Sequence, residues 1–499
     1  RAGEMILFDR AKGRRETAGV VQRISDRHGQ VEPLIEDKLT QHSWPKFLHP
    51  YPLSDKYFLA SCKPTPDSLW GIYLVDVFDN MVLLKEEEGR ALLEPIPLRT
   101  TPRPPVLADR TNPRRDEGTV FLADIYSGPG LKDVPRGTVK KLRVFTYHFA
   151  YQKMAGINHR VGADGPWEVK RVLGTVPVEA DGSAFFRVPA KTPMSFQPLD
   201  EDGKAIQLMR SWVTVMPGEA RSCVGCHEDN RDVPPAAIQK TIAGLRPAES
   251  LEPWYGPPRG FSFAREVQPV LDKYCVSCHN GSPTEDGRTL SDLRGGQSVT
   301  WAYQYGNPDL IRCENTPLEE LAAKYSGLFS PSYVELRKQV RVGGLESDLH
   351  LLPPMEFHAG TSRLIRMLEK GHHGVELNDE AWDRLITWID LNAPAHGTWS
   401  EFTRIKGDQN ARRCALRALY GGRPENGEEI VYGDPPFGGD LTPVAPRPEQ
   451  AKSASTEDEA SSRFRLAGGA SMPAHGEKKY LSLDMGDGVS MRLVWIPAG

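Results

Sequence analysis

The chain has 499 residues, of which 39% are hydrophobic and 26% charged, and its formal net charge is −4 at pH 7. This length predicts about three domains, and the composition is typical of a soluble globular protein. Because the charges nearly balance and no apolar run approaches the ~18 residues of a spanning helix, we expect neither a nucleic-acid partner nor a membrane span.

Residues 1–97 are predicted to form short β-strands. An apolar stretch at 57–61 is followed by a hairpin pattern, in which 70–77 and 81–84 flank the turn residues 78–80. Short strands at regular spacing are typical of propeller blades. We therefore predict that this region is the C-terminal part of a β-propeller.

Residues 98–247 are predicted to form an antiparallel β domain, either a sandwich or an open barrel. A proline-rich connector at 95–113 leads into it and is expected to be extended. Asp181 and Gly182 predict a tight hairpin between strands at 176–180 and 184–188, because glycine readily adopts the positive φ angles that such a turn needs. The last predicted strand, 211–215, runs toward a cysteine motif.

Two Cys-x-x-Cys-His motifs organise the chain. The first comprises Cys223, Cys226 and His227, and the second comprises Cys275, Cys278 and His279. This pattern is the attachment signature of c-type haem, in which both thiols bond to the porphyrin and the histidine binds the iron. We therefore predict two covalently bound haem c groups, with the four cysteines as attachment residues and the two histidines as iron ligands.

The alternative for these cysteines is a structural zinc site that combines both Cys-x-x-Cys pairs. Such pairs usually lie about 15–20 residues apart, whereas these are much further apart and each has its own histidine. Since c-type haem is normally attached outside the cytoplasm, the haem hypothesis implies a periplasmic or otherwise exported protein. Arg1 falls inside a strand pattern, so we expect a preceding segment. In an oxidising compartment Cys313 and Cys414 could form a disulfide or remain free thiols.

Residues 248–420 are predicted to form an all-α, class I cytochrome c-like domain. Apolar residues recur with helical spacing over 263–274, and this helix would end at the second motif. Asn378 is expected to cap a later amphipathic helix, whose apolar positions include Leu385 and Ile389. In a class I cytochrome c, the first and last helices cross beside the haem.

Each iron has a second axial position that the motif does not fill. For the second haem we expect His358 as the ligand, then His372, then Met355; a second histidine gives a low-potential carrier and a methionine raises the potential. For the first haem, His148 or His159 could supply the ligand. If neither does, that iron has an open face, which could bind a small molecule such as NO or peroxide.

The C-terminal part divides into two segments. Residues 421–477 are rich in proline, glycine, serine, glutamate and alanine, which predicts a disordered linker. Order is expected to return at 478–499, where two short apolar stretches occur. This last segment is expected to be the truncated start of a further domain.

The order of these features resembles the hydrazine synthase alpha-subunit family and related multidomain cytochromes of planctomycetes. The resemblance covers residues 1–420 and rests on three stretches: Arg-Ser-Cys-Val-Gly-Cys-His at 221–227, Gly-His-His-Gly-Val at 371–375 and Thr-Trp-Ile-Asp-Leu-Asn-Ala-Pro at 387–394. It implies that the haem at the first motif is a catalytic centre with an unusual ligand set. It also implies that the haem at the second motif is an electron carrier with two histidine ligands.

Residues 478–499 resemble the opening of a formylglycine-generating-enzyme (sulfatase-modifying factor) domain, through Met-Arg-Leu-Val-Trp-Ile-Pro-Ala-Gly at 491–499. A hydrazine-forming subunit has no evident need of such a segment, so we expect a more general function. The expected protein is a dihaem oxidoreductase that acts on a small nitrogen or oxygen species. Its partners would be a redox protein or small-molecule electron carrier, and other subunits of a complex. The alternative is a non-enzymatic electron-transfer cytochrome with both irons six-coordinate and the terminal regions used for docking.

Overall fold

The computed structural model describes residues 2–447 and two strands near the C-terminus, 480–484 and 490–494. Within 2–447 it leaves out 14–16, 25–39, 153, 155–158, 166–167, 210, 228–239, 285–286, 297, 305–306, 308, 344–351 and 423–424. The chain divides into two compact units: Arg1–Lys370 with Leu377–Val444, and Gly371–Glu376 with Ala445–Gly499. In the described ranges, no helix combines the length and the apolar character needed to cross a lipid bilayer.

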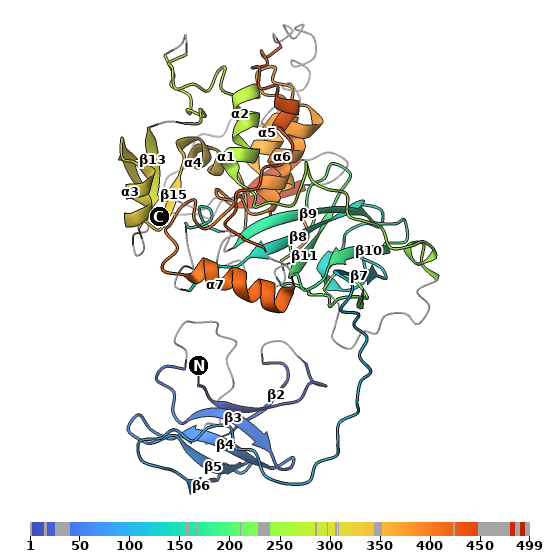
Figure 1. Ribbon diagram of the computed structural model, residues 1–499, viewed down its shortest axis with the longest axis vertical. Coiled ribbons are helices and arrows are strands. Elements are labelled where there is room, and N and C mark those ends of the chain that lie inside the picture. Colours follow the sequence, from blue (N-terminus) through green and yellow to red (C-terminus); the bar gives the residue numbers. More distant parts are fainter. Residues whose placement is uncertain are drawn as a thin grey trace. The chain divides into compact units, whose positions relative to one another are not determined.

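The N-terminal region contains a four-stranded antiparallel sheet in the order β3-β4-β5-β6 (Figure 1). The strands here are β1 (Met5–Phe8), β2 (Val20–Ile24), β3 (Lys46–Pro52), β4 (Tyr57–Lys63), β5 (Gly71–Asp76) and β6 (Met81–Lys85), of which β1 and β2 form a separate pair. The predicted hairpin is confirmed, because β5 pairs with β6 and the Asp76 carboxylate accepts hydrogen bonds from the N–H groups of Phe78 and Asn80. The described strands do not close into a propeller.

The connector at 95–113 contains no helix or strand, as predicted. Its apolar side chains, including Ile96, Leu98 and Leu107, are exposed. An extended, proline-rich segment has no backbone ladder with which to bury such side chains.

The middle region is built from two three-stranded sheets around one core. The sheet orders are β10-β7-β12 and β11-β8-β9. The strands are β7 (Glu117–Leu122), β8 (Lys141–His148), β9 (Val169–Pro177), β10 (Ala184–Pro189), β11 (Met194–Leu199) and β12 (Ala220–Cys223). Val120 and Phe186 from the first sheet and Val144 from the second are buried in a single cluster. Of the two predicted alternatives, this arrangement is the sandwich.

Two details of the middle region differ from a wholly antiparallel domain. Strand β12 runs parallel to β7, with Cys223 opposite Leu122. The predicted strand at 211–215 is reduced to one bridge between Val213 and Met194. Trp212 is 56% exposed. Strand propensity largely reflects packing against neighbours, so a β-favouring sequence without a neighbouring strand does not extend its ladder.

The predicted turn at Asp181 and Gly182 is confirmed, but the predicted hairpin is wrong. Gly182 has a φ of 85°, and the Asp181 carboxylate accepts a hydrogen bond from the N–H of Ser183. The flanking strands β9 and β10 nevertheless belong to different sheets. The turn therefore links the two layers of the sandwich and does not close a hairpin.

The region after residue 248 is not all-α, which corrects our prediction. Its helices are α1 (Phe263–Glu266), α2 (Gln268–Tyr274), α3 (Leu318–Lys324), α4 (Pro331–Arg337), α5 (Arg363–Glu369), α6 (Asp379–Asp390) and α7 (Gln409–Leu416). It also contains a sheet in the order β14-β13-β15, formed by β13 (Val299–Tyr303), β14 (Ile311–Glu314) and β15 (Gly327–Phe329). The β-branched and aromatic residues of β13 favour a strand over a loop between helices.

The two helices predicted to frame the second motif do meet. Helix α2 packs against α6, and the ring centroids of Phe263 and Trp388 lie 5.3 Å apart. Asn378 caps α6 as predicted, because its side chain accepts a hydrogen bond from the N–H of Ala381 at 2.9 Å. The predicted helix 263–274 is split into α1 and α2. Pro269 lies in the first turn of α2, where a helix tolerates proline. Because Pro269 has no N–H, the backbone hydrogen bonds of α1 do not continue into α2.

A buried ion pair joins the sandwich to α6. An Arg143 guanidinium nitrogen lies 3.4 Å from the Asp390 carboxylate, and both side chains are almost fully buried. The same carboxylate accepts a hydrogen bond from the N–H of Ala205, and Gln197 donates to the Asp390 carbonyl. Burial raises the pKa of Asp390 to about 6, against the opposing effect of Arg143. These contacts hold the helical region against strands β8 and β11.

The predicted linker begins with an ordered stretch. Residues 425–444 belong to the first unit, where Asp434 N–H donates to the Tyr255 carbonyl and the Lys273 ammonium donates to the Asp440 carbonyl at 2.7 Å. Polar and backbone contacts hold this stretch in place. Its composition, which is poor in apolar residues, therefore did not predict that it is ordered. Residues 448–477 of the predicted linker lie outside the described residues.

The second unit contains the Gly371–Glu376 loop and the C-terminal strands. The Arg447 N–H donates to the Gly374 carbonyl at 2.8 Å, and the Arg447 guanidinium pairs with Glu376. Strands β16 (Tyr480–Asp484) and β17 (Ser490–Val494) form an antiparallel pair. These strands fall inside the predicted 478–499 segment, of which 485–489 and 495–499 lie outside the described residues.

Candidate haem-attachment sites

The first Cys-x-x-Cys-His motif leaves the end of strand β12. Backbone hydrogen bonds hold it against the loop after β7: Ala123 N–H donates to the Cys223 carbonyl at 2.9 Å, and Cys226 N–H donates to the Ile125 carbonyl at 3.3 Å. Gly130 N–H in turn donates to the Cys226 carbonyl. The 123–130 loop therefore determines the path of the motif backbone.

Two glycines allow this close approach. A Cβ atom at Gly225, inside the motif, would lie 2.1 Å from the Ser127 carbonyl oxygen. A Cβ atom at Gly130 would lie 2.7 Å from the Cys226 sulfur. Any side chain at either position would push the two backbones apart.

The two cysteines of the first motif pack against the sandwich core. Burial raises the pKa of the Cys226 thiol to about 11. His227 follows in an exposed turn with a φ of 56°. Residues 228–239, directly after the motif, lie outside the described residues.

The second motif continues the course of α2. The Cys275 carbonyl accepts hydrogen bonds from the N–H groups of Cys278 at 3.1 Å and His279 at 2.9 Å, which forms one further turn. Burial, together with the nearby Cys278 and Asp272, raises the pKa of the Cys275 thiol to about 12. The sulfur of Cys278 is on an exposed residue. Cys313 and Cys414, which both lie in the described part of the chain, do not form a disulfide in this structure.

The His279 ring is already oriented. Its Nδ1 lies 3.1 Å from the backbone carbonyl oxygen of Ser291, and its own carbonyl accepts a hydrogen bond from Leu293 N–H. A carbonyl oxygen can only accept, so Nδ1 is the donor in this hydrogen bond and Nε2 is the other ring nitrogen. A metal-binding histidine commonly donates its other ring nitrogen in this way. The donor set therefore fits an axial iron ligand.

No three His, Cys, Asp or Glu side chains in the described ranges come together as a metal-ion site. The two Cys-x-x-Cys pairs thus do not combine there into the shared zinc site that we considered as the alternative. A haem attached at one motif needs only the two thiols and the one histidine of that five-residue motif.

The predicted ligands for the second iron have different surroundings. His358 is 3% exposed and has a φ of 78°, and the following Ala359 N–H donates to the buried Asp390 carboxylate at 3.0 Å. Met355 is 54% exposed. His372 belongs to the second unit, where its ring centroid lies 4.8 Å from that of His373.

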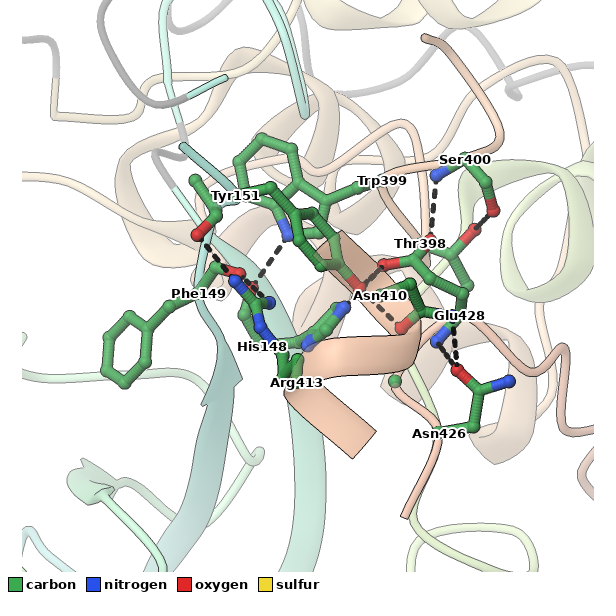
Figure 2. A network of polar contacts seen from close by, with 12 residues as sticks. His148, Phe149, Tyr151, Thr398, Trp399, Ser400, Asn410, Arg413, Asn426 and Glu428 are labelled. Carbon is green, nitrogen blue, oxygen red and sulfur yellow. Dashed lines mark hydrogen bonds and ion pairs between the residues drawn. The ribbon is translucent and has the colours of Figure 1, made fainter. Parts of the chain in front are cut away.

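The two histidines proposed for the first iron are engaged elsewhere. Figure 2 shows His148, at the end of β8, whose Nε2 lies 2.5 Å from a Glu428 carboxylate oxygen. Tyr151 O–H donates to the same oxygen at 3.0 Å. His159 Nε2 lies 3.6 Å from Asp164, and its ring packs 5.0 Å from Tyr303. Burial lowers the pKa of both histidines.

Sequence reasoning missed the partner of His148. Glu428 lies 280 residues away, in the segment that composition assigned to a linker. The Ser400 N–H donates to its second carboxylate oxygen at 2.8 Å, and Trp399 Nε1 donates to the His148 carbonyl. No local pattern around His148 indicates a contact at that separation.

Comparison with known proteins finds a family model that matches the region around the first motif. Residues 137–228 match the family model described as the hydrazine synthase alpha subunit middle domain, and this range includes the first motif. The chain is 20% identical over 337 residues to hydrazine synthase subunit alpha of Kuenenia stuttgartiensis, an alignment that covers 54% of this chain and 40% of that protein. The chain thus spans less than half of this curated relative.

The solved hydrazine synthase of Kuenenia stuttgartiensis is also similar to the chain, with a TM-score of 0.48 and 18% identity over 70% of this chain and 55% of that one. The chain is therefore similar to hydrazine synthase alpha subunits, through a middle domain that carries the first Cys-x-x-Cys-His motif.

Proposed function

We propose that the protein is an exported c-type cytochrome with two covalently attached haems. Cys223 and Cys226 would hold the first, with His227 on its iron. Cys275 and Cys278 would hold the second, with His279 on its iron. The orientation of His279 carries this proposal, because its Nδ1 faces the Ser291 carbonyl and its Nε2 is the nitrogen that would bind iron. The haems would supply one-electron iron chemistry.

We further propose that the protein is an oxidoreductase acting on a small nitrogen or oxygen species at the first haem. The match of residues 137–228 to the hydrazine synthase alpha middle domain supports this role. The contact of His148 with Glu428 supports it as well, because His148 could serve as a sixth ligand only if this buried contact broke. An iron without a sixth ligand would keep an open face.

The second haem would relay electrons. His358 is the first candidate for its remaining axial position, because it is buried, and His372 and Met355 are the next candidates. The contact of α2 with α6 supports a cytochrome c-like arrangement around this motif. The redox partner would be a protein or a small-molecule carrier. Since the relative in Kuenenia stuttgartiensis is named as a subunit, other subunits are proposed partners too.

The terminal regions would serve for docking. We propose that the β3-β4-β5-β6 sheet is a blade of a β-propeller, because four antiparallel strands in sequential order are the repeating unit of that fold. The β16–β17 pair would open a formylglycine-generating-enzyme-like domain. Attachment of c-type haem outside the cytoplasm makes the periplasm the proposed location.

The test is to produce the chain with an export signal and a c-haem maturation system, and to measure its intact mass. We expect the mass of the polypeptide plus two haems. A mass with no added haem would contradict the proposal. A mass increase of only one haem would contradict separate catalytic and electron-relay haems.

The second candidate function is electron transfer without catalysis. The burial of His358 favours it for the second haem, and ligation of the first iron by His148 or His159 would extend it to the first. Absorption spectra of the reduced protein with CO and NO separate the two functions. A shifted Soret band indicates an accessible iron, as catalysis needs, whereas unchanged spectra with both ligands would leave only electron transfer.

A further inference from the structure

A large cavity lies between the sandwich and α7, away from both cysteine motifs in the chain. Its volume is about 830 Å³, and it is lined from the sandwich side by residues around Tyr151, Lys191 and Met216. The opposite wall is α7 and the π-helical turn that follows it (Arg417–Gly421). Binding pockets for small organic molecules typically have volumes of about 300–1,000 Å³.

The α7 wall presents one face of the helix. The lining residues from this element are Gln409, Arg412, Arg413, Leu416, Arg417 and Tyr420. They are spaced by three or four residues, so they stack on the same side of a helix. Three of them are arginines, and Lys191 adds a fourth cation from the sandwich side. Among the described residues that line this cavity, none is an aspartate or a glutamate.

Two of these cations are held in place by neutral groups. Arg413 donates to the carbonyls of Phe149 and Ala150 at 2.5 and 2.7 Å, and its guanidinium lies 3.7 Å from the centre of the Tyr151 ring. Lys191 donates to the Tyr420 carbonyl at 3.1 Å. Figure 2 shows Arg413 and Tyr151 beside the His148–Glu428 pair. Carbonyls orient a cation without cancelling its charge.

The nearby carboxylates are used in a neighbouring cavity. This smaller cavity of about 340 Å³ shares Thr192, Arg413 and Arg417 with the larger one. There Glu425 pairs with both Arg171 and Arg417, and Glu428 pairs with His148. Within the described residues, no carboxylate forms an ion pair with Lys191, Arg412 or Arg413. The larger cavity thus keeps a net positive charge.

The walls of the larger cavity are also partly apolar. Met216, Leu416 and Tyr420 line it, and they are 44%, 43% and 72% exposed. Exposed apolar side chains beside uncompensated arginines suit a ligand with an apolar body and an anionic end. Arginine is well matched to a carboxylate, because its planar guanidinium can donate two parallel hydrogen bonds.

We propose that this cavity is a binding site for a small organic anion, one with a flat apolar body and a carboxylate group. Arg412 and Lys191 would bind the carboxylate, and Met216, Leu416 and Tyr420 would contact the body. Arg413 would be held in position by Tyr151. Anion binding at this site does not depend on haem attachment. An absence of anion binding and an absence of haem would therefore be distinguishable results.

The test measures binding of 2-naphthoate to the full chain by isothermal titration calorimetry. We expect 2-naphthoate to bind at least tenfold more tightly than the neutral 2-naphthamide and than inorganic phosphate. The double variant Arg412→Gln/Lys191→Gln is expected to weaken 2-naphthoate binding at least tenfold. Binding should also weaken with added salt, because an uncompensated charge is screened.

Lys140→Gln is the matched control, because it removes one cation from an exposed position outside the cavity. It is expected to leave the affinity unchanged. Leu416→Glu provides a second variant, which places a negative charge in the wall and is expected to weaken 2-naphthoate binding more than 2-naphthamide binding. Equal affinities for 2-naphthoate and 2-naphthamide would overturn the proposal. So would phosphate binding as tightly as 2-naphthoate, or no response to the double variant in a folded protein.

Discussion

The two Cys-x-x-Cys-His motifs share the same pattern but are supported by different structures. The first leaves the end of a parallel strand, and its backbone is held by the 123–130 loop through close contacts at Gly225 and Gly130. The second extends helix α2 by one turn, and its histidine ring is oriented by the Ser291 carbonyl. The motif therefore specifies the reactive groups. The surrounding fold determines which substitutions outside the motif would disturb each site.

Replacing the cysteines gives the largest expected effect and separates the two sites. In a host that attaches c-type haem, Cys275→Ala/Cys278→Ala and Cys223→Ala/Cys226→Ala should each lower the intact mass by one haem. Cys414→Ser is the control, because this thiol lies outside both motifs, and it should keep both haems. If both haems survived in either double variant, the assignment of that motif would be wrong.

Asp390→Asn should strongly destabilise the helical region that carries the second motif. The change leaves the Arg143 guanidinium buried without its carboxylate partner, and breaking a buried ion pair in this way costs about 3–5 kcal/mol. The measurement is urea unfolding followed by tryptophan fluorescence, since Trp388 lies in α6. Asp133→Asn, at an exposed position, is the control and should change the free energy of unfolding by less than about 0.5 kcal/mol. A similar small loss for both variants would contradict the role of the pair.

Gly225→Ala should affect the first site alone. Its Cβ atom would lie 2.1 Å from the Ser127 carbonyl oxygen, and overpacking of this kind costs about 1–3 kcal/mol. We expect a lower free energy of unfolding and reduced haem attachment at the first motif, with the second motif unchanged. Gly421→Ala has open space around its Cβ position and serves as the matched control. Equal haem content in the two variants would show that the 123–130 loop does not constrain the first motif.

Mild acid should weaken the helical region by a smaller amount. His396 is enclosed between Phe329 and Phe402, and burial lowers its pKa. The folded state then binds fewer protons than the unfolded state once the pH falls below about 6.5, so the free energy of unfolding decreases from there toward the folded-state pKa. Urea unfolding at about pH 7.5 and pH 5.5 measures the difference. His396→Gln should reduce that difference, whereas exposed His42→Gln should leave it unchanged, and the reverse result would exclude His396 as a cause.

Local patterns predicted the elements whose geometry depends on adjacent residues. The β5–β6 hairpin, the Asp181-Gly182 turn and the Asn378 cap on α6 all formed as expected, because their hydrogen bonds join residues a few positions apart. Local patterns failed at Pro269, which splits one predicted helix into two. They also failed at strands β13 to β15, which lie in a region predicted to be all-α.

By itself, the sequence determined the two sets of thiols and histidines, because a c-type motif places its reactive groups within five consecutive residues. Only the tertiary structure decided what surrounds them. It paired β12 with β7, joined His148 to Glu428 across 280 residues and gathered four cations around one cavity. Such contacts form when segments that are distant in the sequence pack together and exclude water. A short stretch of sequence therefore does not indicate which distant segment it will contact.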